Sequence, residues 1–226
     1  MLTIDYKKVF DTDTSFYSKY YNFGENYHLH ESNAQYEYHK LLTYLSYQFN
    51  GITIIDIGTS SGESCLALAQ NKNNKVITYD IAPPHNNGWK WEDTPNELPF
   101  LKDYDNIEVR VRDINMEEPD ILLGAAFMFF DIGHYGEAEK MFSDMLENNN
   151  YKGYILCDDC YSTLHPGCTK WFSELTTEKY NLTEVGHYHP EYGLGSGLLN
   201  YHNDNSVKLI KLSFESWKTK DQQIPQ

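Results

Sequence analysis

The sequence is short of basic residues and of long apolar runs, and each shortage excludes a class of protein. Lys and Arg number 18 against 33 Asp and Glu, which gives a formal net charge of −15. Such a surface repels phosphate backbones and anionic lipids, and no local basic patch offsets it, so we expect no nucleic-acid partner and no membrane partner. No apolar run approaches the ~18 residues of a membrane span, and the N-terminus lacks the apolar core of a signal peptide.

Cysteine, repeats and linkers are also scarce. Four cysteines in 226 residues are too few for a disulfide framework, so a reducing, cytoplasmic compartment is the expectation. Without a Pro-rich or Gly/Ser-rich linker, a chain of this length is expected to fold as one domain with a full core. The 19 tyrosines argue against disorder. The oligomeric state stays open, and a homo-oligomer is one of the alternatives.

Short apolar runs alternate with helical segments from residue 51 onward. Runs rich in β-branched and aromatic residues predict strands at 52–57, 75–80, 107–112, 126–131 and 153–158. Strands that alternate with helices are typical of βαβ units, and hence of an α/β, Rossmann-like, doubly wound and mostly parallel sheet. Three further runs follow at 182–188, 197–202 and 207–213. We expect the last two to pair as a hairpin.

Helical spacing predicts two helices of particular interest. One begins after Gly62, and the other follows His134 and carries one apolar face, made of Ala138, Met141, Phe142 and Met145. Before residue 51, a polar arm that is irregular up to residue 31 leads into an amphipathic cap helix, whose capping box begins at Ser32.

Each central strand is closed by an acidic residue at its carboxyl end. Strands two to five are followed by Asp80, Asp113, Asp131 and the pair Asp158 and Asp159. Taken alone, Asp80 or Asp113 is better explained as a helix N-cap, whereas the spacing of Asp131 with Asp158 and Asp159 favours ligands over caps. In an open α/β sheet, however, all these strand ends meet at the edge where ligands bind. Together they predict a negative rim that binds a cationic or hydroxyl-bearing ligand.

The turn after the first strand, DIGTSSGE, indicates which ligand. It lacks the middle glycine of the dinucleotide pattern G-x-G-x-x-G, because residue 60 is a serine, and Asp56 and Glu63 stand where a phosphate site carries Lys or Arg. Asp80 follows Gly58 by 22 residues, the offset at which a carboxylate accepts ribose hydroxyls. Asp113 is placed to bind an adenine amine. A cationic amino acid, a ribose and an adenine make up S-adenosylmethionine, although the glycines alone are also explained by a tight turn.

Several segments resemble a known family. DIGTSSGES, ITYDI and RDI resemble the cofactor motifs of class I S-adenosylmethionine-dependent methyltransferases, and FFDIGHYGEAEKMFSDML, GYILCDD and HPGCTKWFSEL resemble metal-dependent, macrocin-type small-molecule O-methyltransferases. The resemblance covers about residues 50–190. It implies a seven-strand fold and methyl transfer to a hydroxyl of a small molecule or sugar. The implied cofactor-binding residues are Asp56, Gly58, Thr59, Ser60, Gly62, Glu63, Asp80, Ile81, Asp113 and Asp131.

The resemblance also implies a metal site and a base. Asp131, Asp158 and Asp159 stand at the family's metal-ligand positions, and three converging carboxylates without Lys or Arg favour Mg²⁺ or a similar divalent cation. Where relatives carry a second Asp as a proposed base, this chain has Gly133. His134 is then the candidate catalytic base, which requires a neutral imidazole.

A second metal pattern overlaps this one. Cys157, Cys160, His165 and Cys168 are of zinc-ligand type, but the acidic pair within the run favours the carboxylate interpretation.

The chain is thus predicted to comprise an N-terminal arm and cap helix (1–50), an S-adenosylmethionine-binding catalytic domain (51–215) and a polar tail (216–226). Two other functions stay open. A nucleotide-dependent oxidoreductase on the same fold is disfavoured by the missing glycine. A catalytically inactive binding module is disfavoured by the retained acidic residues, which repel one another without serving a site.

Overall fold

A computed structural model describes residues 1–21, 35–85, 97–186 and 195–212. The capping box predicted from Ser32 and the polar tail lie outside these ranges. The strands are β1 (Leu2–Asp5), β2 (Thr53–Ile57), β3 (Lys75–Asp80), β4 (Ile107–Val111), β5 (Phe127–Phe130), β6 (Tyr154–Cys157), β7 (Glu178–Asn181), β8 (Gly197–Asn200) and β9 (Val207–Ile210). The α-helices are α1 (Tyr6–Phe10), α3 (Gln35–Ser46), α4 (Glu63–Leu68), α5 (Pro119–Leu123), α6 (Glu137–Asn148) and α7 (Pro166–Glu174), and short 3-10 turns are η1 (Ser15–Lys19), η3 (Leu101–Asp103) and η4 (Ile114–Met116).

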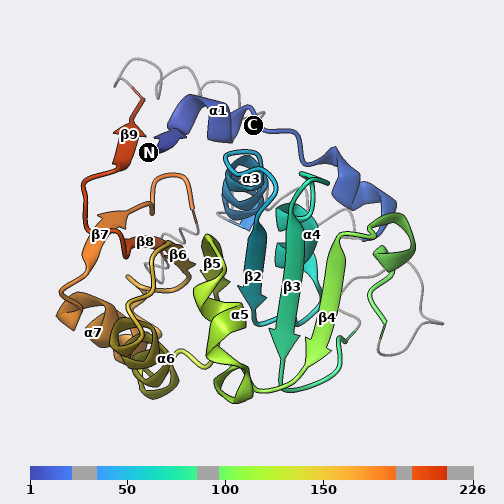
Figure 1. Ribbon diagram of the computed structural model, residues 1–226. Coiled ribbons are helices and arrows are strands. Elements are labelled where there is room, and N and C mark those ends of the chain that lie inside the picture. The colour runs from blue at the N-terminus through green and yellow to red at the C-terminus, as the bar shows by residue number, and fades with distance from the viewer. Residues whose placement is uncertain (22–34, 86–96, 187–194, 213–226) are drawn as a thin grey trace.

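A seven-stranded sheet forms the centre of the molecule (Figure 1). The order of its strands is β4-β3-β2-β5-β6-β8-β7. The first five strands in this order are parallel to one another, and β8 is antiparallel to both of its neighbours. This arrangement confirms the predicted Rossmann-like α/β fold. The strand order reverses between β2 and β5, and such a reversal is where open α/β sheets bind their ligands.

Burial on both faces explains why the central strands are continuous apolar runs. β5 reads FMFF and β6 reads YILC, and all their residues are buried. One core lies between the sheet and helices α3 and α4. The other lies on the opposite face, under α5, α6 and α7, which stand in front of the sheet in Figure 1. The edge strand β4, whose sequence IEVRV alternates, is half-buried over its first four residues and exposed at its last.

The predicted hairpin of 197–202 with 207–213 is wrong. β8 lies between β6 and β7, because all four of its residues are buried and need a neighbour on each side. Asn203 and Asn205 then adopt left-handed backbone conformations and turn the chain away from the sheet. β9, with only alternate residues partly buried, pairs in parallel with β1 instead.

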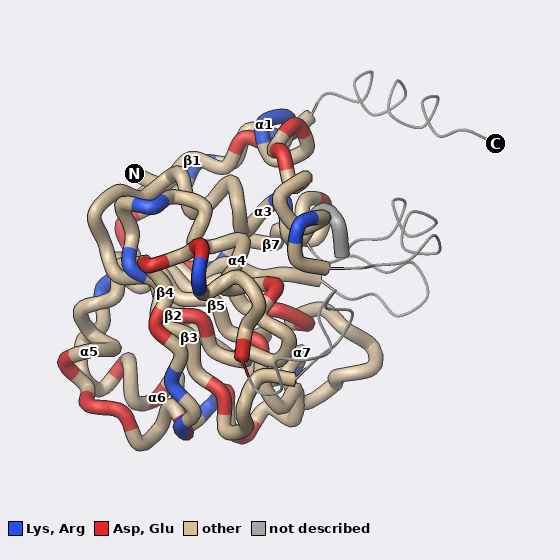
Figure 2. The backbone as a smooth tube through the Cα atoms, turned by 90° about the vertical axis from the view of Figure 1, so that its right-hand side faces the viewer, with Lys and Arg blue, Asp and Glu red and all other residues tan. Residues whose placement is uncertain are grey.

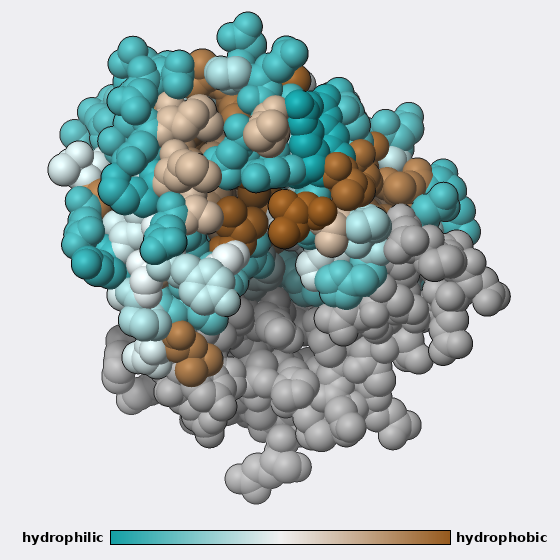
Figure 3. All heavy atoms as spheres, turned by 90° about the horizontal axis from the view of Figure 1, so that it is seen from below, coloured by the Kyte–Doolittle hydropathy of each residue, from teal (hydrophilic) through white to brown (hydrophobic). Residues whose placement is uncertain are grey.

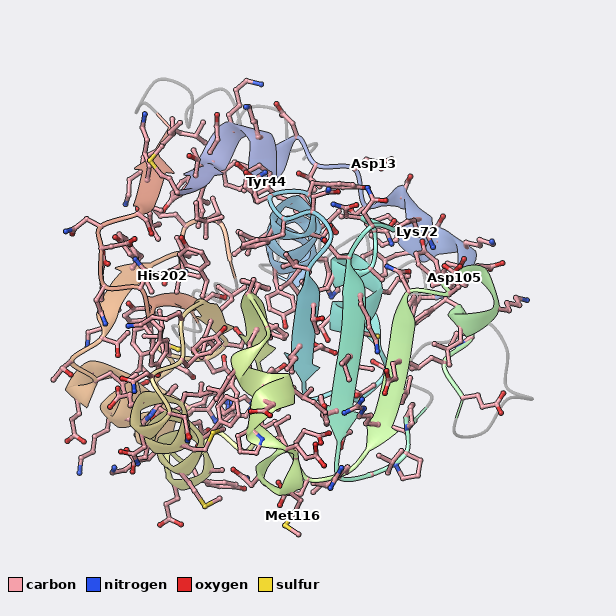
Figure 4. All side chains as sticks on the ribbon, in the orientation of Figure 1. Asp13, Tyr44, Lys72, Asp105, Met116 and His202 are labelled. Carbon is pink, nitrogen blue, oxygen red and sulfur yellow. The ribbon has the colours of Figure 1, made fainter. Side chains whose placement is uncertain are left out.

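The N-terminal arm is more regular than predicted, since β1 and α1 occupy its first ten residues. Tyr44 of α3 fixes β1 in place: its hydroxyl donates to the Thr3 carbonyl at 2.9 Å and accepts from the Asp5 amide at 3.3 Å (Figure 4). Tyr17 and Tyr21 reach the turn after β2, where they donate to the carbonyls of Glu63 (2.6 Å) and Ser61 (2.9 Å). Among the described helices, none has the length and apolar character to cross a membrane.

Candidate cofactor and active site

A cavity of about 670 Å³ opens at the carboxyl ends of the parallel strands, beside the reversal point between β2 and β5. This volume is typical of pockets that hold a cofactor-sized ligand. Figure 4 marks the two ends of the neighbouring edge strand, with Asp105 before β4 and Met116 beyond it on the side of the cavity. Seen from that side, apolar side chains gather around a hollow in the surface (Figure 3).

The cavity takes residues from the ends of four strands. Many predicted cofactor residues line it: Gly58, Ser60, Asp80, Ile81, Asp113 and Asp131. Four predicted residues are absent from the lining: Asp56, Thr59, Gly62 and Glu63. The lining also contains Arg112, Ala138 and Met141, which the sequence did not single out as site residues.

The residues absent from the lining support the turn after β2 from behind. Asp56 is fully buried, where it accepts a hydrogen bond from the Thr78 hydroxyl at 2.6 Å, and Thr78 in turn lies 2.6 Å from the Thr59 hydroxyl. Burial raises the pKa of Asp56 to about 7. Burial likewise raises the pKa of Glu63 to about 7, and His39 lies beside that carboxylate at 3.8 Å. These side chains therefore belong to the support of the turn.

Asp80 is held rigidly at the cavity wall. Its carboxylate accepts from the Ser60 amide at 2.8 Å and from the Ala82 amide at 3.1 Å, one on each oxygen. Each carboxylate oxygen has further acceptor capacity. Ile81 follows on the cavity wall with 81% of its surface exposed. On the rim's other side, the Asp113 carboxylate accepts from the Asn115 amide at 2.9 Å.

Backbone packing requires a glycine at position 58, a reason that the sequence did not reveal. Its φ is +107°, and a Cβ on it would lie 2.0 Å from the carbonyl oxygen of Asp131. The glycine therefore lets the turn after β2 touch the turn after β5 backbone to backbone. A larger residue at position 58 would therefore disrupt this backbone contact before it reduced the room for a ligand.

Two histidines meet the strand-end carboxylates where the cavity ends. His134 Nε2 lies 3.3 Å from Asp131 Oδ1, and His134 Nδ1 lies 3.7 Å from Asp159 Oδ2. His165 Nε2 lies 3.2 Å from the same Asp159 oxygen, and the two imidazole rings are 4.4 Å apart. In Figure 2, acidic positions (red) recur along the segments around the ends of β2 and β3. We call His134, His165, Asp131 and Asp159 the His–Asp cluster.

The cluster changes the protonation expected for His134. Burial lowers the pKa of His134, but the hydrogen bond with Cys168 and the charges of Asp131 and Asp159 outweigh it and raise the pKa to about 9. The imidazole therefore carries a proton at neutral pH in this environment. A general base needs the neutral form that the sequence interpretation assumed.

The backbone of the cluster lies in sparsely populated conformations. His134 has φ of +56° and Asp159 has φ of +54°. The His134 amide donates to the Ile132 carbonyl across Gly133, which itself has φ of +56°. This tight turn favours glycine at 133, which is a local reason for the missing second Asp. Non-glycine residues held at positive φ are found more often at functional sites than elsewhere.

The described residues also bring together ligand atoms of mixed type. Among the described residues, two sets of three side chains bring one ligand atom each within 4.8 Å of one another. They are His134 with Asp159 and His165, and His134 with Glu139 and Cys168. Neither consists of carboxylates alone. Asp158, at 7% exposed, accepts a hydrogen bond from Ser196 at 3.4 Å.

The zinc pattern in the sequence is only partly assembled. All four cysteines are free and buried. Cys168 lies beside Cys160 and His134, and hydrogen bonds from these two groups lower its pKa to about 7 despite its burial. His165 belongs to the other set. The four residues of the sequence pattern therefore do not gather around one point in the structure.

No protein-family model and no curated protein matches the sequence. Solved structures do match. A cofactor-bound protein of MTB, Rv0187, is 16% identical over 72% of this chain and 78% of its own, with a TM-score of 0.53. An O-methyltransferase of Bacillus cereus in complex with SAH is 17% identical over 72% and 80%, with a TM-score of 0.49. Fibrillarin of Aeropyrum pernix with natively bound S-adenosyl-L-methionine is 15% identical over 66% of each chain, with a TM-score of 0.46. At such identities the likeness concerns the fold alone.

Proposed function

We propose that the chain is an S-adenosylmethionine-dependent methyltransferase that methylates a hydroxyl of a small molecule or sugar. The observation that carries the proposal is the cavity itself, which lies at the reversal point of the sheet and has carboxylates at two separate positions on its wall. The cavity also ends at a cluster of imidazoles and carboxylates, since Asp131 and His134 line both. One ligand can therefore reach from the Asp80 side to the reacting groups.

Asp80 is the residue that we assign to the ribose. Because two backbone amides fix its carboxylate, it is oriented before the ligand arrives and loses little side-chain entropy on binding. Its remaining lone pairs accept the two hydroxyls of a ribose. The exposed Ile81 and Met141 offer apolar surface to an adenine ring, and Asp113 offers an acceptor to its amine.

The transferred methyl group then faces the His–Asp cluster. A methyl on a sulfonium is already electrophilic, so the chain has to hold the acceptor oxygen in line with it and provide a destination for the hydroxyl proton. Without a bound ion, the carboxylates around His134 favour its protonated form, so for that state we assign the proton to a carboxylate of the cluster. Asp131 is the more accessible of the two, with 34% of its side chain exposed against 8% for Asp159.

Calorimetry with S-adenosylhomocysteine and with NADH tests the cofactor. We expect the first to bind and the second not to bind. Asp80→Ala should weaken binding about 10–100-fold, because it removes hydrogen bonds to a charged acceptor. Asp105→Ala serves as the control, since it deletes an exposed carboxylate at the opposite end of the sheet. Binding of NADH alone would favour the oxidoreductase, and equal affinities of Asp80→Ala and wild type would place the cofactor elsewhere.

A further inference from the structure

We propose that His134, His165 and Asp159 form a binding site for a first-row transition metal ion of the Zn²⁺ type, oriented by Asp131 from outside. The site differs from the all-carboxylate magnesium site that the sequence predicts. Binding of the ion does not depend on the proposed function. Only its role rests on that function, since such an ion next to the cavity lowers the pKa of an acceptor hydroxyl.

The first argument is the number and type of converging ligand atoms. One nitrogen from each imidazole and one carboxylate oxygen lie within 4.8 Å of one another, with Asp159 Oδ2 shared between His134 and His165. Two imidazoles and one carboxylate make a set that suits Zn²⁺, Fe²⁺ or Ni²⁺, whereas Mg²⁺ prefers oxygen ligands throughout. Three protein ligands also leave coordination positions for water or a substrate oxygen.

The second argument is the partner of the remaining imidazole nitrogen. When His134 Nδ1 faces Asp159, its Nε2 faces Asp131 at 3.3 Å. A metal-binding histidine almost always donates its second N–H to a carboxylate or carbonyl, which fixes the ring and its tautomer. Asp131 is placed for that role. With an ion bound, Asp131 is therefore an orienting partner, and neither the metal ligand that the sequence predicts nor the proton acceptor assigned above for the site without an ion.

The third argument is how the fold brings two distant loops together. His134 follows β5 and His165 precedes α7, and the two loops touch backbone to backbone at Gly136 and Gly167. A Cβ on Gly136 would lie 2.4 Å from the Gly167 carbonyl oxygen, and one on Gly167 would lie 2.0 Å from the Tyr135 carbonyl oxygen. Neither position admits a side chain without moving the other loop. The main chain therefore brings together the two segments that carry these imidazoles, whose rings lie 4.4 Å apart.

The competing set is His134 with Glu139 and Cys168. It is more enclosed, since Glu139 and Cys168 are buried, and it supplies a thiolate in place of the second imidazole. Two of its ligand atoms have other partners, since Glu139 Oε2 accepts from the Gly136 amide at 2.9 Å and the Cys168 thiol lies 3.7 Å from the Asp158 carbonyl. Glu139 Oε1, in contrast, is buried without a hydrogen-bond partner, so this set is a real competitor. The exposed fractions of His134 and His165, 25% and 31%, give the first set a path for the ion to enter.

Titration of the metal-free protein with Zn²⁺ and with Co²⁺ tests the proposal, with calorimetry for the first ion and the visible spectrum for the second. We expect one ion per chain and no displacement by excess Mg²⁺. Asp131→Asn should weaken binding ~10–100-fold, as losses of outer partners do, and His165→Gln should weaken it more. His202→Gln is the matched control, because His202 is an exposed histidine at the other edge of the sheet (Figure 4).

Cys168→Ser separates the two sets. We expect it to leave the affinity unchanged, and we expect the Co²⁺ spectrum to lack a thiolate charge-transfer band. If Cys168→Ser abolishes binding and that band is present, the ion uses the competing set and the proposal is wrong. It is equally wrong if wild type binds neither ion, or if His165→Gln binds like wild type.

Calorimetry with S-adenosylhomocysteine on the same variants distinguishes failure of the metal-site proposal from failure of the proposed function. His165→Gln should bind S-adenosylhomocysteine like wild type, which also shows that it is folded. Loss of cofactor binding in wild type, with metal binding as described, would refute the methyltransferase and leave the metal site standing.

Discussion

Asp56 makes the stability of this protein depend on pH in an unusual direction. Its carboxyl is fully buried on β2, and burial raises its pKa from 3.8 to about 7. In the unfolded chain the group ionises near its ordinary value, so between these two pH values the folded state binds the extra proton. Stability then falls as pH rises through this window and stays low above pH 7. At ~1.36 kcal/mol per pKa unit, the shift corresponds to at most about 4 kcal/mol.

Asp56→Asn removes this titration while keeping an oxygen for the Thr78 hydroxyl. The new amide group introduces an unsatisfied donor that costs about 1–3 kcal/mol at every pH. The pH dependence of the difference between variant and wild type is therefore the informative quantity. Glu63, whose pKa is also raised to about 7, contributes equally to both proteins and cancels.

Urea unfolding of both proteins at several pH values from 4.5 to 8 measures this difference. We expect the variant to gain stability relative to wild type as pH rises, by up to about 4 kcal/mol. Asp105→Asn, at an exposed position, should show a constant difference. A constant difference for Asp56→Asn as well would show that the buried carboxyl does not hold its proton, and the reasoning would be wrong.

Three further predictions concern stability. Gly58→Ala should prevent correct folding, since its Cβ meets the Asp131 carbonyl oxygen at 2.0 Å; a cooperative melt close to that of wild type would contradict this. Tyr17→Phe loses the hydrogen bond to the Glu63 carbonyl and should cost about 0.5–1.5 kcal/mol in urea unfolding, whereas no measurable cost would mean that the bond adds nothing to stability. Leu156→Ala empties a buried position in β6 and should cost about 2–5 kcal/mol, and a cost below 1 kcal/mol would show that the core closes over it.

The parallel sheet follows from the sequence because local pattern determines it. The runs that form β5 and β6 are continuous and apolar, as is typical of strands covered on both faces, and β2 and β3 are mainly β-branched and buried. Pairing across long separations is different. Nothing near Leu2 indicates that β1 pairs with β9 about two hundred residues later, because such a pairing depends on what the rest of the sheet leaves uncovered.

The candidate site, too, was predictable from the sequence only in part. The acidic strand ends predict Asp80 and Asp113 on the cavity wall, because the carboxyl ends of parallel strands share one edge. Met141 was predicted only as part of an apolar helix face, which looks the same whether it meets the core or a cavity; 53% of its surface is exposed. His165 was grouped with cysteines near it in sequence. Its meeting with His134 depends on the contact of Gly136 with Gly167, which no local pattern encodes.

A crystal structure of the complex with S-adenosylhomocysteine tests the central claim most directly. We predict that the ligand lies in the cavity beside Ile81 and Met141, with its ribose hydroxyls on the Asp80 carboxylate and its sulfur directed toward the His–Asp cluster. A ligand bound outside this cavity would contradict the account, and so would one bound in it with the sulfur directed away from His134.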